Sequence, residues 1–258
     1  MESSYRDHVR MEVSLVVAAI DDFSNKAISG NGLHVWIEGE KPAIKKEEGY
    51  YIFVNLQRTE FILNVEGGIY YKQQLHIDNE KLFHYSRKIL KVRMIPNRSY
   101  PIPQNTTCIE GVTRKNSVIL AYSEEHVNPY KLLYPYEGEE NIHIFHPEDV
   151  DIEGKLLLIK NKDETQMEFF QVEEKTEEEK KTYRLPSTLK GTYKKVGTVI
   201  YPVYTVEADK NGEFYLPIAN IYADKIKFSF CIAGQEEKKK IVELLTGRVN
   251  KIDLTDIL

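Results

Sequence analysis

Cysteine is scarce in this sequence, and its spacing argues against the usual thiolate centres. Cys108 and Cys231 are the two cysteines among 258 residues, and neither belongs to a CxxC motif. Structural zinc sites and thiol redox sites need closely spaced cysteine pairs, so neither kind of site is predicted. Because free cysteine is usually buried, we expect two buried thiols, with a single bridge inside the second half of the chain as the alternative.

Long apolar runs and a surplus of positive charge are also absent. The formal net charge is −5, so no global basic field draws the chain to nucleic acid or to acidic lipid. No stretch approaches the ~20 apolar residues that span a bilayer. The run from Val13 to Ile20 is short for the core of a signal peptide, and Asp21 closes it. It predicts a buried strand in a chain that is made in the cytoplasm without a signal peptide.

What the sequence does contain is a series of short alternating segments. Residues 33–37 and 50–56 place apolar side chains at every second position, and polar turn stretches rich in glycine and lysine separate them. The segment 81–92, KLFHYSRKILKV, can also be read at helical spacing, but the alternation in ILKVRMI favours a strand. Short strands at near-regular spacing predict an all-β sandwich or barrel.

One phrase occurs twice. EEGYYIFVNL at 47–56 and DKNGEFYLPI at 209–218 each place charged turn residues before a glycine, followed by an aromatic-rich strand pattern. The first phrase is followed by EFILNVEGG at 60–68, and the second by DKIKFSFCIAG at 224–234. The repetition predicts two copies of one β-sandwich design.

The first copy resembles a known domain family. Its order of a polar loop, a G-x-x-V strand, a G-Y-Y-I-F-V-N-L strand and an F-x-L-x-V strand is similar to the carboxypeptidase regulatory-like domains, which are transthyretin-like (prealbumin-like) β-sandwiches. The resemblance covers roughly residues 11–95 and implies a fold without catalysis of its own. The matching positions are Asp22, Ile28, Gly32, Val35, Gly49, Tyr51, Phe53, Leu56, Leu63 and Val65.

These patterns predict two tandem Ig-like or transthyretin-like sandwiches, the second of them interrupted. We expect a first sandwich at 1–96, a proline-rich linker at 97–105, and a second sandwich at 106–258. A plain copy leaves no room for residues 123–195, which read as further strands. We therefore predict a β-rich insertion there, and insertions on a rigid scaffold often carry function.

The best binding candidates are aromatic. Tyr130, Tyr134 and Tyr136 lie near two prolines in NPYKLLYPYEG, and exposed tyrosines bury a large area at small entropic cost. The alternative is that they cover the core of the insertion. Trp36, on an alternating strand, is the fourth binding candidate.

Signals for metals and catalysis are weak. His143 and His146 are the best metal candidates, but their odd spacing on an extended chain places them on opposite faces. A loop calcium site at Asp21, Asp22 and Asn25 lacks the EF-hand pattern. No nucleophile motif organises a serine, and no cofactor or metal is predicted.

Three functions remain open on this basis. The first is a non-catalytic structural or interaction protein with protein partners. The stretch 91–113 is similar to linkers in proteins of phage-tail-like contractile particles, which implies a particle or baseplate component that is released with its particle. The second function is a carbohydrate-binding or surface-adhesion module that uses Trp36 or the tyrosines around Tyr134. The third is an enzyme whose site on the insertion joins His143 or His146 to a carboxylate or a metal.

Overall fold

The computed structural model describes residues 11–30, 32–78, 89–123, 125, 130–177, 180–219, 221 and 223–257. Within these ranges the secondary structure consists of strands β1 to β22 and a single 3-10 turn, Thr255–Ile257. None of the described helical structure is therefore long and apolar enough to cross a membrane. The predicted strand residues 81–88 and part of the start of the insertion, 126–129, lie outside the described ranges.

The chain divides into two compact units. The first contains Met1–Ile20, Ala27–Gly68 and Lys72–Val92, and the second contains Asp21–Lys26, Ile69–Tyr71 and Arg93–Leu258. The short segments 21–26 and 69–71 therefore belong by their contacts to the second unit.

The first sandwich has two sheets around one core. One sheet has the order β2 (Lys26–Ala27), β1 (Val13–Asp21), β5 (Tyr50–Val54), β4 (Ile44–Lys45), and β8 (Ile89–Met94) also pairs with β1. The other has the order β3 (Leu33–Ile37), β6 (Glu60–Gly67), β7 (Tyr70–Asp78). Because successive side chains point to opposite faces, every second residue enters the core. Leu15, Val17, Phe53, Leu63 and Val65 are at most 2% exposed.

The second sandwich repeats this topology. One sheet has the order β19 (Glu213–Ile218), β9 (Thr107–Val112), β22 (Val249–Asp253), and its strands correspond to β5, β1 and β8. The other has the order β18 (Tyr204–Glu207), β10 (Val118–Ser123), β20 (Lys225–Ile232), β21 (Gln235–Leu245), of which the last three correspond to β3, β6 and β7. Its core includes Ile109, Ala121, Phe214, Phe228 and Phe230.

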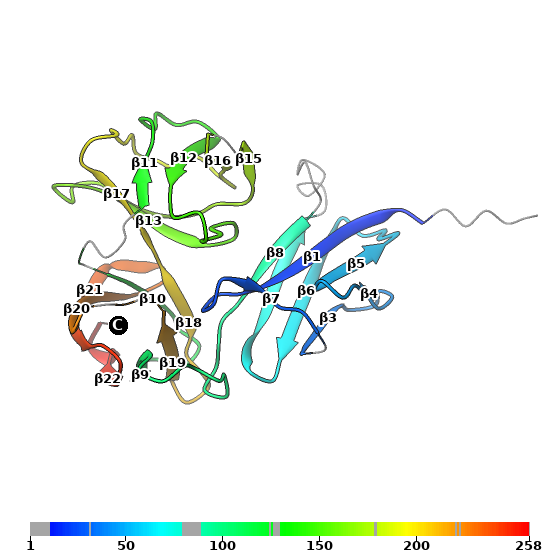
Figure 1. Cartoon of the computed structure of the whole chain (residues 1–258), viewed down its shortest axis with the longest axis horizontal. Helices are drawn as coiled ribbons and strands as arrows, with labels where there is room; N and C mark the ends of the chain where they lie inside the picture. Colours follow the sequence, from blue (N-terminus) through cyan, green and yellow to red (C-terminus); the bar gives the residue numbers. More distant parts are fainter. Residues whose placement is uncertain are drawn as a thin grey trace, which may run out of the picture. The chain divides into compact units, whose positions relative to one another are not determined.

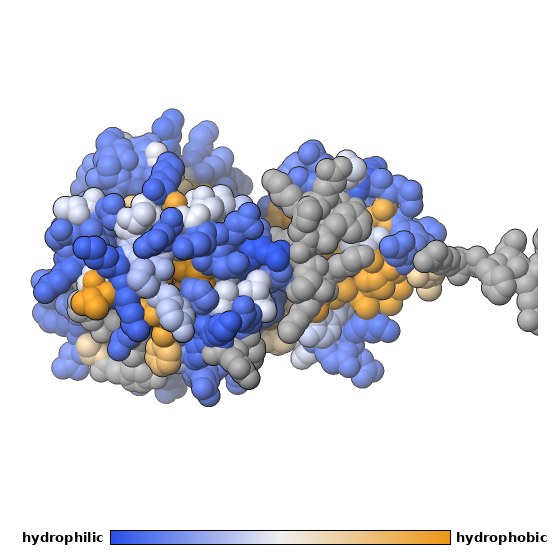
Figure 2. Space-filling view, turned by 90° about the horizontal axis from the view of Figure 1, so that it is seen from above, coloured by the Kyte–Doolittle hydropathy of each residue, from blue (hydrophilic) through white to orange (hydrophobic). Residues whose placement is uncertain are grey.

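The outer faces of the two corresponding sheets differ. In the first sandwich the apolar side chains of Val16, Ile52 and Val54 are partly exposed, and Ile44 is 41% exposed. Figure 2 shows hydrophobic side chains gathered on the surface of this unit, on the right of the view. The outer face of the matching sheet in the second sandwich mixes the exposed Val112 and Val249 with charged groups: Glu110, Glu213, Lys251 and Asp253.

The repeated phrase forms the same turn in both copies. The Gly49 N–H donates to the carbonyl of Lys46 at 3.1 Å, and the Gly212 N–H donates to that of Asp209 at 2.9 Å. Both glycines have positive φ, 89° and 81°. A Cβ on Gly49 would lie 2.4 Å from the Ile28 carbonyl oxygen, and one on Gly212 would lie 2.1 Å from that of Thr113. Each copy therefore needs glycine for conformation and for close backbone approach.

The insertion forms a sheet of its own (Figure 1). Its strand order is β14 (Met167–Gln171), β13 (Leu156–Asn161), β17 (Thr198–Pro202), β11 (Tyr130–Leu132), β12 (Asn141–Phe145), β16 (Thr182–Arg184), β15 (Lys175–Glu177). The sheet encloses a core rich in aliphatic residues and tyrosine, including Leu132, Ile144, Leu157, Tyr183 and Ile200.

The insertion is anchored to the second sandwich by continuous chain and by apolar packing. Strand β17 of the inserted sheet runs into β18 of the sandwich after Val203. Leu120 and Tyr122 of β10 pack with Leu158 and Tyr201 in a buried cluster. The prediction of an all-β chain with two tandem sandwiches, the second carrying a β-rich insertion, is confirmed.

The paired turn glycines yield a stability prediction. Gly49→Ala and Gly212→Ala should each destabilise the protein by about 3 kcal/mol, because the free-energy cost of a positive φ and that of the clash between Cβ and a carbonyl oxygen add together. Gly30→Ala and Gly234→Ala are matched controls, since these glycines have φ of 82° and 83° with nothing within 4 Å of the added Cβ. The controls should lose only about 1 kcal/mol in urea unfolding. Equal losses in all four variants would contradict the role of close approach.

Candidate functional site

A groove on the inserted sheet is the best candidate site. It lies where the chain leaves β11 and returns as β12, and its volume is about 330 Å³. Tyr134 is 53% exposed beside it. The groove is lined by Leu132, Tyr134, Pro135, Tyr136, Glu139, Asn141, Ile142 and His143.

The loop that carries Tyr134 is held from below by Tyr136. This side chain is 2% exposed, and its hydroxyl donates to the Glu139 carbonyl at 2.8 Å and accepts the Leu189 N–H at 2.8 Å. The backbones of Tyr136 and Tyr193 exchange two hydrogen bonds of 2.9 Å. Tyr134 is therefore presented from a loop with a fixed base.

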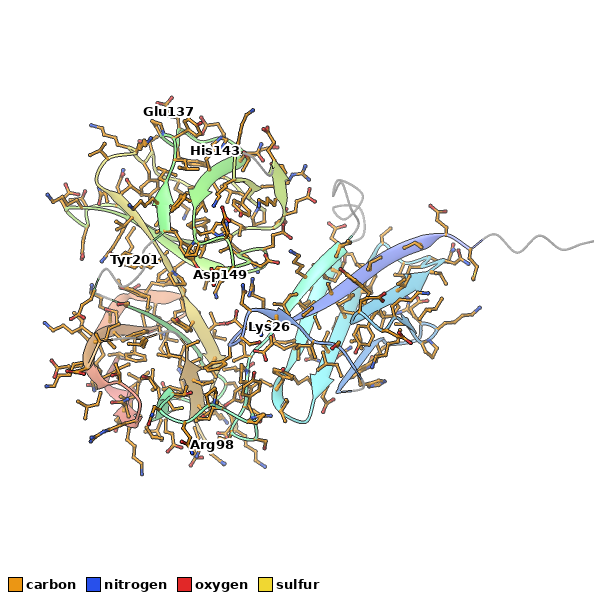
Figure 3. The ribbon with its side chains drawn as sticks, in the orientation of Figure 1. Lys26, Arg98, Glu137, His143, Asp149 and Tyr201 are labelled. Atoms are coloured by element: carbon orange, nitrogen blue, oxygen red, sulfur yellow. The ribbon has the colours of Figure 1, made fainter. Side chains whose placement is uncertain are left out.

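The polar groups of the groove are positioned by hydrogen bonds. The ring of His143 meets that of Tyr134 edge to face, with centroids 4.8 Å apart, and its Nδ1 lies 3.0 Å from the Thr182 hydroxyl. The Glu137 N–H donates to the Glu139 carboxylate at 2.9 Å and, together with other backbone N–H groups, lowers the pKa of that carboxyl. Figure 3 shows Glu137 and His143 at the same end of the inserted sheet. The groove thus combines an aromatic ring, an imidazole and an ionised carboxylate.

The structure separates the predicted aromatic candidates. Tyr130 and Tyr136 are 5% and 2% exposed and belong to the core of the insertion, as the alternative interpretation expected. Tyr134 alone among these three is exposed. Trp36 lies on β3 of the first sandwich, where its ring stacks on His34 at 4.4 Å and lies 5.3 Å from the Lys72 ammonium. Trp36 and Tyr134 therefore belong to different units.

The two histidines do not form a metal site. On β12, His143 follows the exposed side with Asn141, whereas His146 is buried behind the strand. The His146 Nε2 contacts the Tyr183 hydroxyl, and its Nδ1 lies 2.8 Å from the Pro147 carbonyl oxygen. Asp149 lies at the far end of the inserted sheet from His143 (Figure 3). No group of three metal-ligating side chains occurs among the described residues.

In the acidic loop at Asp21, hydrogen-bond donors of the protein itself engage the carboxylate. The Asp21 carboxylate accepts the Phe23 and Ser24 N–H groups and the hydroxyls of Tyr70 and Tyr100, at 3.0 and 2.5 Å. Burial and Asp21 together raise the pKa of Tyr100 to about 12. The loop is thus a hydrogen-bonded cross-link within the second unit.

Asp22 and Asn25 are engaged by a buried guanidinium. Arg93 donates to Asp22 Oδ1 at 3.2 Å and to Asn25 Oδ1 at 3.0 Å. Lys155 Nζ lies 3.7 Å from the same Asp22 oxygen, and burial lowers the pKa of this lysine. No pattern in the sequence indicated this cluster, because its members are separated by up to 133 residues.

Comparison with known proteins adds no family. No family model matches the chain, and no curated protein matches it. Two variants of the shaft pilin spaA from Lactobacillus rhamnosus GG are 8% identical to it, cover 93% of this chain and 96% of their own, and have TM-scores of 0.24 and 0.23. The Bacillus anthracis TIE protein is 11% identical, with 94% of this chain and 50% of that chain covered and a TM-score of 0.22. Likeness at this level has no bearing on function.

The buried histidine yields a pH prediction. Burial lowers the pKa of His146 below its ordinary value of 6.5, so the folded state resists protonation that the unfolded chain accepts. Stability should therefore be complete above pH 6.5 and fall as the pH drops below it. Melting temperatures at pH 7.5, 6.5 and 5.5 should fall for the wild type, and the fall should be smaller for His146→Gln. His143→Gln is the matched control and should keep the wild-type slope.

Proposed function

We propose that this chain is a non-catalytic structural and interaction protein. In this proposal the two sandwiches form a scaffold, and the inserted sheet presents the groove at Tyr134 to a partner. The observation that supports it is a half-exposed tyrosine ring, fixed against His143 on a loop whose base is hydrogen-bonded. Such rigid aromatic side chains are efficient anchors in protein interfaces.

The chemistry of the groove favours binding over catalysis. His143 does share the groove with the Glu139 carboxylate. The hydroxyl that His143 could activate as a nucleophile is that of Thr182, which lies within hydrogen-bonding distance of it. Thr182 is only 4% exposed. A substrate cannot reach a buried hydroxyl without displacing the strand. The buried ionisable groups Asp21 and Arg93 are engaged in cross-links within the protein.

A protein partner is the first choice, and the apolar outer face of the first sandwich supports it. Exposed apolar area of this kind is typical of interaction surfaces. The narrower assignments stay predictions from the sequence: a carboxypeptidase regulatory-like, transthyretin-like origin of the sandwiches, and a place in a phage-tail-like particle released after cytoplasmic synthesis.

Carbohydrate is the second candidate partner. A sugar ring stacks on an aromatic face and needs hydrogen-bonding groups at its rim. The groove offers Tyr134 for stacking, with Asn141 and Glu139 beside it. This arrangement favours a neutral saccharide or one with an amino group over an acidic one, because Glu139 is ionised.

Tyr134→Ala tests both candidates. The variant should keep the melting temperature of the wild type, since the side chain is exposed, and should weaken partner binding at least tenfold. Binding is measured by retention of components from a lysate of the source cell and on a panel of immobilised glycans. Ile241→Ala, at an apolar residue of β21 that is also 53% exposed, is the control. Retained binding in Tyr134→Ala would refute the groove as the contact site. Turnover of any of these glycans by the wild type that is lost in His143→Gln would refute a non-catalytic role.

A further inference from the structure

The two sandwiches differ at one sheet edge. In the second, β10 lies between β20 and β18. In the first, the corresponding strand β3 pairs with β6 alone among the described residues. The difference arises from the connection that follows each strand, because the chain after β3 forms β4, which joins the opposite sheet by pairing with β5. The position that β18 occupies in the second sandwich is therefore filled by no strand of the described part of the first.

A groove of about 430 Å³ runs along this free edge. One wall is β3 itself, whose Val35 and Ile37 are 5% and 3% exposed, and the other includes Pro42, Ala43 and Tyr51. All of these residues belong to the first unit. Strand β3 lies at the margin of that unit in Figure 1. The edge is therefore bordered by apolar side chains on its core side.

A side chain partly satisfies the free backbone. The Tyr51 hydroxyl donates to the Leu33 carbonyl at 3.3 Å. Tyr51 lies two residues after the turn glycine Gly49. The residue two positions after Gly212, at the same place in the second sandwich, is Phe214, which has no hydroxyl. There β18 pairs with β10, with Val206 opposite Ile119 and Tyr204 opposite Ala121. A hydroxyl is present in the copy that lacks the strand and absent from the copy that has it.

We infer that the free edge of β3 binds an extended peptide segment, which adds to the sheet as an antiparallel strand. Open sheet edges pair with extended chains through their backbone groups, and alternate side-chain pockets give specificity. This site is separate from the groove at Tyr134, and it does not rest on the function proposed for that groove.

Strand β18, which pairs with β10 in the second sandwich, indicates which side chains the peptide should carry. Val206 and Tyr204 pack against the core, whereas Glu207 on the other face is exposed. The occupant should carry β-branched or aromatic residues at alternate positions and polar residues between them. An antiparallel strand begins at the Ile37 end of β3, where the exposed carboxylate of Glu38 lies. A basic residue at the N-terminal end of the peptide complements that charge.

The probe is a fluorescent peptide with the sequence KVYTVEA, which places a lysine before residues 203–208. Added to the full chain, it should bind saturably, and the amide signals of Leu33, Val35 and Ile37 should shift and exchange more slowly with solvent. Two control peptides, KVYTPEA and KVYTDEA, should bind at least tenfold more weakly, because one removes the backbone donor that corresponds to the β10-facing N–H of Val206 and the other places a carboxylate against the core. Equal binding of all three peptides, or shifts confined to β10 and β18, would overturn the inference.

Variants of the protein complete the test. Tyr51→Phe releases the Leu33 carbonyl and should tighten peptide binding about threefold, whereas Tyr50→Phe, on the neighbouring exposed position, should leave it unchanged. Tyr134→Ala should also leave it unchanged, which separates this site from the proposed partner groove. No binding at millimolar peptide, or weaker binding to Tyr51→Phe, would show that β3 does not accept a strand.

Discussion

The backbone of every strand needs hydrogen-bonding partners, and this requirement explains why the two sandwiches differ in which sheet edges are paired. The corresponding strands have the same order in both sandwiches, so both have edges that must be paired, shielded or left open. The connection that leads from β3 to β5 in the first half, and from β10 to β19 in the second, decides the outcome. In the first half it is short and covers β5 through β4. In the second half it contains the whole inserted sheet and returns as β18, which covers β10.

Two carboxylates, the buried Asp21 and the half-buried Glu168, hold loops of this framework in place. Asp21 ties its own turn to two tyrosines, and Glu168 accepts the N–H groups of Lys190 and Gly191 and the Tyr193 hydroxyl. A buried carboxylate is tolerated because several donors replace the water it has lost. The same groups that the composition alone would offer as ligands or catalysts are thereby committed to structure. The ring of Tyr134, by contrast, is exposed and can contact a partner.

Strand patterns were readable in the sequence because alternation and turn glycine are local properties. Val35 and Leu63 could be placed on a shared face from spacing alone, and both are buried, and Gly49 and Gly212 marked the same turn in both copies. The site was less predictable. Tyr130, Tyr134 and Tyr136 look alike in a proline-flanked run, but two of them are core residues. The Arg93 cluster left no sequence signal, because its partners meet only after distant segments fold together.

The sequence by itself determined the all-β class, the duplication and the presence of an extra β-rich segment in the second copy, since each follows from period-two burial punctuated by turns. The tertiary structure decided which tyrosine faces solvent, which carboxylates are engaged and which sheet edge stays open. Those outcomes depend on which sheet a connecting strand joins. Alternation assigns a side chain to a face of its strand, but it does not say which neighbours cover that face.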